Sequence, residues 1–170
     1  RMQNNQNTVF QLLTKRADNM ALIAGDLADA SGRWPANVWA GVTVENAKHI
    51  DRIKTLQGMA EPCVKWVSFE PLLGDIGPVD LSGIDWAVIG GLNINAGWEN
   101  WQKSTGNKKA DCKAEFEKHG IPDHYDEWVS SLVKTCKDQG VAVFVKQGWG
   151  GMAGSKLEHF PKINGQRWYE

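Results

Sequence analysis

The sequence predicts an α/β protein: a partial (β/α) barrel of about five parallel strands with helices outside, with an open doubly wound sheet as the alternative. Apolar runs typical of buried strands alternate along the chain with amphipathic helical segments, which is the pattern of parallel strands joined by right-handed crossovers. The repeat is roughly 20 to 30 residues long, as in the βα units of a barrel. Five units are too few to close a barrel of eight strands, so an incomplete barrel or an open sheet is expected.

The predicted strands share one design, an apolar body followed by ionic, amide or glycine residues. Such nearly continuous apolar runs indicate a sheet that is covered on both faces or closed into a barrel. The central run ends at Glu70, because Pro71 has no N–H to donate to a neighbouring strand and keeps the residue before it extended. The predicted strands are residues 9–13, 38–44, 64–69, 86–89 and 141–145.

Two amphipathic helices are predicted in the first half of the chain. The first is ended by Gly32 and Pro35, and the second follows Asn46, a favourable N-cap, and ends at Gly58. Their apolar faces are Met20, Ile23, Ala24 and Leu27 in the first helix and Ile50, Ile53 and Leu56 in the second, which has Asp51, Arg52 and Lys54 on its solvent side.

A third helix is predicted after a long loop at residues 93–120. Asp126 is expected to cap this helix, and Gly140 to end it at the C′ position. Its apolar face is Trp128, Val129, Leu132, Val133 and Cys136.

Three of the nine tryptophans lie inside predicted strands: Trp39, Trp66 and Trp86. Aromatic side chains of this size bury a large apolar area, so we expect these three in the core or the barrel wall.

Length, charge and cysteine usage limit the classes of function. A chain of 170 residues is expected to form a single α/β domain over residues 1–170. Its formal net charge of −1 gives no electrostatic case for a dedicated nucleic-acid binder. No apolar run approaches the roughly 20 residues of a membrane span. Cys63, Cys112 and Cys136 are odd in number and widely spaced, which favours free thiols in a reducing cytoplasm over a disulfide framework or a zinc site.

Ligands of parallel α/β sheets bind at the carboxyl ends of the strands, so the residues that follow the predicted strands are the candidate binding residues. Cations there can pair with a carboxylate or phosphate, and acids with an amine or ribose hydroxyls. Glycines let a ligand approach the backbone. A polar mouth for a zwitterionic ligand is therefore predicted from Lys15, Arg16, Glu45, Asn46, Ser68, Glu70, Gly90, Gly91, Lys146 and Gln147.

No conventional catalytic set is present in the sequence, so no catalytic residue is assigned. The four histidines show no metal-ligand spacing, and no metal site is expected. Gly90 and Gly91 lack the rest of a dinucleotide fingerprint, and the chain has neither a phosphate-loop nor a nucleophile-elbow motif.

Five phrases in a fixed order resemble the three-cysteine-motif phage protein family, a radical-SAM-like family. They are residues 10–16, 37–46, 68–74, 83–91 and 145–147. The resemblance covers most of the chain and implies the later strands of a partial (β/α) barrel. In full-length relatives an earlier segment supplies clustered cysteines that look like ligands of a [4Fe–4S] cluster, which would hold and reductively cleave S-adenosylmethionine.

By this resemblance, six of the candidate residues would line the cofactor and substrate mouth: Lys15, Glu45, Ser68, Glu70, Lys146 and Gln147. The clustered cysteines are absent from this sequence, so S-adenosylmethionine is the cofactor expected here, and the cluster only if a further N-terminal segment supplies its ligands. Two functions follow as expectations. The chain is the C-terminal part of a radical-SAM-like protein, or a short, cluster-free relative that acts by binding a host or phage partner. Missing strands would leave an open parallel edge, where a homodimer or a partner protein is expected.

Overall fold

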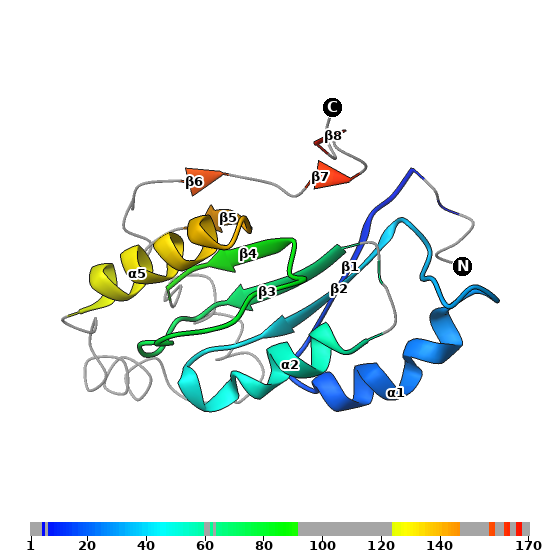
Figure 1. Ribbon diagram of the computed structural model, residues 1–170, viewed down its shortest axis with the longest axis horizontal. Coiled ribbons are helices and arrows are strands. Elements are labelled where there is room, and N and C mark those ends of the chain that lie inside the picture. The colour runs from blue at the N-terminus through cyan, green and yellow to red at the C-terminus, as the bar shows by residue number, and fades with distance from the viewer. Residues whose placement is uncertain are drawn as a thin grey trace, which may run out of the picture.

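Five parallel strands form the centre of the computed structural model, in the order β1-β2-β3-β4-β5 (Figure 1). The structure describes residues 5, 7–59, 62, 64–91 and 124–146, together with three short strands at 157–158, 162–163 and 166–167. The predicted strands are confirmed to within one residue at each end. Their bounds are β1 Phe10–Thr14, β2 Val38–Thr43, β3 Val64–Phe69, β4 Trp86–Ile89 and β5 Ala142–Val145.

The two edges of this sheet differ. β6, Leu157–Glu158, pairs antiparallel with β5 and extends the sheet on that side. At the other side β1 pairs with β2, and no further described strand follows it, so the described sheet is not closed into a barrel. β7, Lys162–Ile163, and β8, Gln166–Arg167, pair with each other as a separate two-stranded sheet.

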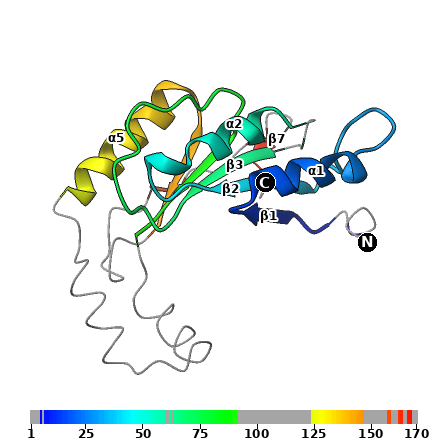
Figure 2. The same cartoon turned by 90° about the horizontal axis from the view of Figure 1, so that it is seen from below.

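Three helices cover the same face of the sheet, the one seen from below in Figure 2. They are α1 Ala17–Leu27, α2 Asp51–Gln57, which follows the short 3₁₀ helix η1 Ala47–His49, and α5 Tyr125–Asp138. A doubly wound sheet would carry helices on both faces and reverse its strand order at a switch point. The described sheet is open and compatible with both predicted architectures, although its sequential strand order and the single face covered by the described helices are the arrangement expected of a partial barrel. Among the described helices, none has the length and apolar character needed to cross a bilayer.

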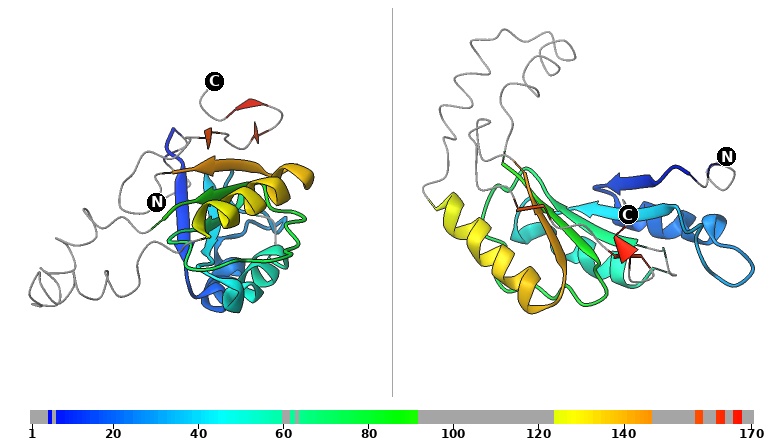
Figure 3. Two further views of the ribbon diagram at one scale, coloured as in Figure 1. Left: turned by 90° about the vertical axis from the view of Figure 1, so that its left-hand side faces the viewer. Right: turned by 90° about the horizontal axis from the view of Figure 1, so that it is seen from above.

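The sheet is twisted, and its side chains form one packed layer on each face. β1 and β5, at the two ends of the parallel run, point in clearly different directions, as expected of a twisted sheet (Figure 3). Alternate residues face the helices and form the larger core, which includes Val42, Val67 and Val143. Residues of the opposite parity form a second cluster around tryptophans on the other face.

The three strand tryptophans are confirmed as core residues of this second cluster. Their ring centroids lie 5.5 Å apart between Trp66 and Trp86 and 6.1 Å apart between Trp39 and Trp86. Trp66 lies across Gly41, its register partner in β2, where a Cβ atom would stand 2.3 Å from Cε2 of the indole. Only glycine therefore fits beneath the ring in this packing.

The first helix differs from its prediction in two ways. Met20 and Ala24 are buried as expected, but Ile23 is 51% exposed. The buried stripe begins at Ala17 and runs through Met20 and Ala24, a spacing that turns Ile23 outward. The helix also ends at Leu27, so Gly32, with a φ of +78°, belongs to the turn that follows rather than to the helix end.

Of the three predictions for the ends of the later helices, that for Gly140 is confirmed, that for Asn46 holds for the preceding helix η1 rather than for α2, whose N-cap is Ile50, and that for Asp126 is wrong. Asn46 caps η1, accepting a 3.0 Å hydrogen bond from the backbone N–H two residues on, and Gly140 follows α5 with a φ of +72°. Asp126 is not a cap, because α5 begins at Tyr125 with His124 at the N-cap position. The Asp126 carboxylate instead lies in the first turn, where the helix dipole still favours a negative charge.

Candidate functional site

Parallel pairing brings the ends of four strands to one level at the carboxyl edge of the sheet. Thr43, Ser68, Val88 and Phe144 form one row of register partners across β2, β3, β4 and β5. The residues two positions beyond this row are Glu45, Glu70, Gly90 and Lys146. We call these four residues and Lys15, which follows the end of β1, the rim.

Glu45 lies between two cations at this rim. Its side chain is 9% exposed, and its two carboxylate oxygens accept from Lys15 Nζ and from a terminal nitrogen of Arg52, the latter at 2.8 Å. The same nitrogen of Arg52 donates to the backbone carbonyl of Thr43 at 2.7 Å. These contacts tie β1, β2 and α2 together at one carboxylate.

The surroundings of Glu45 act on its pKa in opposite directions. Burial, the largest single influence, raises the pKa because it disfavours the charged form. The hydrogen bond from Lys15, a backbone hydrogen bond and the hydrogen bond from Arg52 together outweigh it, so the pKa lies below its ordinary value of 4.5. Glu45 is therefore ionised at neutral pH.

Glu70 and Lys146 form the second ion pair of the rim. Lys146 Nζ lies 2.9 Å from Oε2 of Glu70, although their strands are separated by β4. Gly90, at the end of β4, lies beneath the Glu70 side chain, and a Cβ atom there would stand 3.1 Å from Glu70 Cδ. The missing side chain of Gly90 thus leaves the room in which Glu70 reaches toward β5.

This arrangement assigns Gly90 a role different from the predicted one. The glycine was expected to let a ligand approach the backbone, but the Glu70 carboxylate occupies that space. Asn46, also a predicted site residue, uses its side-chain oxygen to cap η1. Ser68 is buried one row below the rim beside Thr43, and Gly91 is buried at the end of β4. Gln147 lies outside the described residues.

Two residues close to the rim were not predicted from the sequence. The prediction that Arg52 lies on the solvent side of its helix is wrong, because its long side chain folds back to Glu45. Tyr125, in the first turn of α5, is buried, and its pKa is raised to about 12 by burial, by Asp126 and by the negative charge of Glu70. The phenol is therefore a neutral group within electrostatic reach of Glu70.

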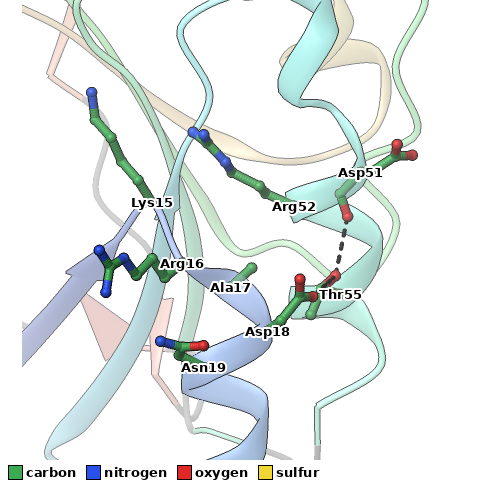
Figure 4. Close-up of a pocket in the computed structure, with 8 residues that line it drawn as sticks. All are labelled: Lys15, Arg16, Ala17, Asp18, Asn19, Asp51, Arg52 and Thr55. Carbon is green, nitrogen blue, oxygen red and sulfur yellow. Dashed lines mark hydrogen bonds between the residues drawn. The ribbon is translucent and has the colours of Figure 1, made fainter.

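A cavity of about 300 Å³ opens beside the rim, between the first turns of α1 and α2 (Figure 4). Lys15, Arg16 and Arg52 form what we call its basic wall. Its opposite side, the acidic wall, is formed by Asp18, Asp51 and Thr55. Figure 4 shows the basic groups of Lys15, Arg16 and Arg52 on one side and the carboxylates of Asp18 and Asp51 on the other.

The comparisons with known proteins give one match. A family model with the description "Protein of unknown function (DUF5131)" matches residues 1–116. No curated protein and no solved structure matches the chain. The matched residues include β1 to β4, α1 and α2, and with them Lys15, Glu45, Glu70 and Gly90 of the rim.

Proposed function

The chain belongs to the DUF5131 family of proteins of unknown function, and on that premise we propose that its rim binds a small zwitterionic ligand, S-adenosylmethionine, as in a radical-SAM-like protein. The resemblance of five ordered sequence phrases to radical-SAM-like phage proteins supports the choice of ligand. The observation that carries the proposal is the pair of opposite charges at the carboxyl edge of a parallel α/β sheet, where ligands of such folds bind.

Within the rim, Glu70 and Lys146 are the residues through which the ligand binds. Their side chains are 29% and 47% exposed, whereas Glu45 is almost fully covered by its two cations. An α-amino acid group presents an ammonium and a carboxylate side by side. The ammonium pairs with Glu70 and the carboxylate with Lys146, which replaces one internal ion pair by two to the ligand.

The described residues do not fit the iron–sulfur cluster of the radical-SAM-like relatives. Such a cluster is held by several cysteine thiolates. Cys136, the one cysteine in the described part of the chain, is fully buried, and burial raises the pKa of its thiol to about 12. Cys63 and Cys112 lie outside that part. The proposal is therefore limited to ligand binding, without a redox step.

Calorimetric titration with S-adenosylmethionine tests this proposal. Glu70→Gln and Lys146→Gln are each expected to weaken binding about tenfold or more, because each removes one charge-assisted hydrogen bond. Lys134→Gln is the matched control, since Lys134 also pairs with a carboxylate, Asp138, but lies on the exposed surface of α5. Absence of binding, or an equal loss in the control, would contradict the proposal. Anaerobic iron–sulfur reconstitution of this chain is expected to give no cluster absorbance in the visible spectrum.

A second function, binding of a protein partner at the β1 edge, is favoured by one observation. Leu13 on β1 is 47% exposed, and β1 has a single neighbouring strand in the described sheet. An edge strand presents unpaired backbone groups that a second chain can use. We propose a second copy of this chain as the occupant. Light scattering over a range of concentrations should then show a dimer that Leu13→Lys weakens, and a monomer at high concentration would exclude it.

A further inference from the structure

We propose that the cavity between α1 and α2 binds a small sugar phosphate, with the phosphate on its basic wall and the sugar hydroxyls on its acidic wall. The cavity lies at the end of β1, and neither Glu70 nor Lys146 lines it. The proposal is therefore separate from the binding of a zwitterion at that ion pair.

The basic wall has hydrogen-bond donors that the described part of the chain does not use. Arg52 uses one terminal nitrogen for Thr43 and Glu45, and a guanidinium carries five N–H donors in all. Lys15 is 60% exposed beside the cavity. Arg16 is exposed, and its backbone N–H, held 2.9 Å from Oγ1 of Thr14, fixes the turn that presents its side chain.

The charge of the basic wall matches a phosphate. Lys15 and Arg52 share a single carboxylate, that of Glu45, and Arg16 forms no ion pair with the described residues. Three cations and one carboxylate leave a net charge of +2, which is equal and opposite to the −2 charge of a phosphate monoester dianion. Guanidinium groups also match the spacing of phosphate oxygens better than ammonium groups do.

The acidic wall offers acceptors for hydroxyl groups. The Asp51 carboxylate pairs with Lys54 at 3.2 Å, so its charge is compensated within α2. The Thr55 hydroxyl lies 3.3 Å from both Oδ1 of Asp18 and the backbone carbonyl oxygen of Asp51, and its single proton is donated to one of them at a time. No described residue donates to the second carboxylate oxygen of Asp18, which leaves it for a ligand. Carboxylates are strong acceptors for sugar hydroxyls. The polarity of the two walls therefore favours a ligand with a phosphate at one end and hydroxyls at the other.

The volume limits the size of this ligand. Small-molecule sites usually measure about 300 to 1,000 Å³, so this cavity is at the lower end of the range. A single sugar ring with one phosphate fits this class, whereas a dinucleotide requires a larger site. The ligand class is therefore a monosaccharide phosphate or the sugar phosphate part of a mononucleotide.

Calorimetric titration of the full chain with ribose 5-phosphate, inorganic phosphate and ribose tests this inference. Ribose 5-phosphate is expected to bind at least tenfold more tightly than phosphate, and ribose more weakly than either. Arg16→Gln should weaken the binding of both phosphates about tenfold. Asp18→Ala should reduce the affinity for ribose 5-phosphate to that for inorganic phosphate, without weakening the latter.

Arg33→Gln is the matched control, because Arg33 is an exposed arginine of the loop after α1, outside the cavity lining. It should leave both affinities unchanged, and so should Glu70→Gln, which separates this site from the Glu70–Lys146 pair. Arg16 and Asp18 are exposed, so circular dichroism should show folded variants. No binding at millimolar concentration, equal affinity for the two phosphates, or an equal response to Arg16→Gln and Arg33→Gln would overturn the inference.

Discussion

Glu70 and Lys146 pair across the end of an intervening strand, with 2.9 Å between Oε2 and Nζ. The two residues are 76 positions apart in the sequence. They meet because Gly90 has no side chain at the point where the Glu70 carboxylate crosses β4. A pair of partly exposed charges contributes little to stability, so its geometry is of more interest for binding than for folding.

Gly90→Ala is expected to weaken the coupling between Glu70 and Lys146. The added Cβ would lie 3.1 to 3.2 Å from Cδ, Cγ and Oε1 of Glu70, so the flexible side chain must move away. A double-mutant cycle of Glu70→Gln and Lys146→Gln, measured by urea unfolding, should give a coupling of about 0.2–1 kcal/mol that falls in Gly90→Ala. Gly74→Ala is the control, because its nearest neighbour would be 3.7 Å away, and an unchanged coupling in Gly90→Ala would contradict the prediction.

Gly41→Ala is expected to destabilise the fold strongly. The Cβ would lie 2.3 Å from the Trp66 indole, a rigid ring that is buried against Trp86. Overpacking of this kind costs about 1–3 kcal/mol or more in the free energy of unfolding, which urea denaturation measures. Gly25→Ala in α1 is the opposite case, since no atom lies within 4 Å, and it should stabilise the protein by about 0.5–1 kcal/mol. Equal urea midpoints for Gly41→Ala and Gly25→Ala would contradict the claim that the Trp66 ring leaves no room for a side chain at Gly41.

Glu45→Gln is expected to lower stability at neutral pH by about 1–3 kcal/mol, because it leaves Lys15 and Arg52 without their shared carboxylate. The pKa of Glu45 is lower in the folded state than its ordinary value of 4.5. The contribution of the Glu45 carboxylate to stability is therefore complete above its ordinary pKa of 4.5 and is lost as the pH falls through the lower, folded-state pKa. The difference in stability between the parent and Glu45→Gln should shrink between pH 7 and pH 3, and a constant difference would show that Glu45 acts by packing alone.

Cys136 is expected to resist alkylation in the folded protein. Its side chain is completely buried, and burial raises the pKa of the thiol to about 12, so almost no thiolate forms at pH 8. Peptide mapping by mass spectrometry after iodoacetamide treatment should find Cys136 unmodified in native buffer and modified in urea. Rapid native alkylation would show that the helix α5 does not pack as described.

The sequence alone determined the parallel strands and the edge at which their polar ends meet. Long apolar runs that each stop at a charged, amide or glycine residue specify buried strands and their direction, because strand composition and chain order are local properties. The placing of Lys15, Glu45, Glu70 and Lys146 at one edge follows from that direction.

Tertiary structure decided which of these side chains meet. The period of α2 pointed Arg52 to solvent, but a long side chain near the end of β2 can fold back onto Glu45. The pairing of Glu70 with Lys146, the approach of Tyr125 and the role of Gly90 depend on which strands are neighbours and on how much space lies between them. These are properties of packing between segments distant in the chain, and hydrophobic periodicity carries no information about them.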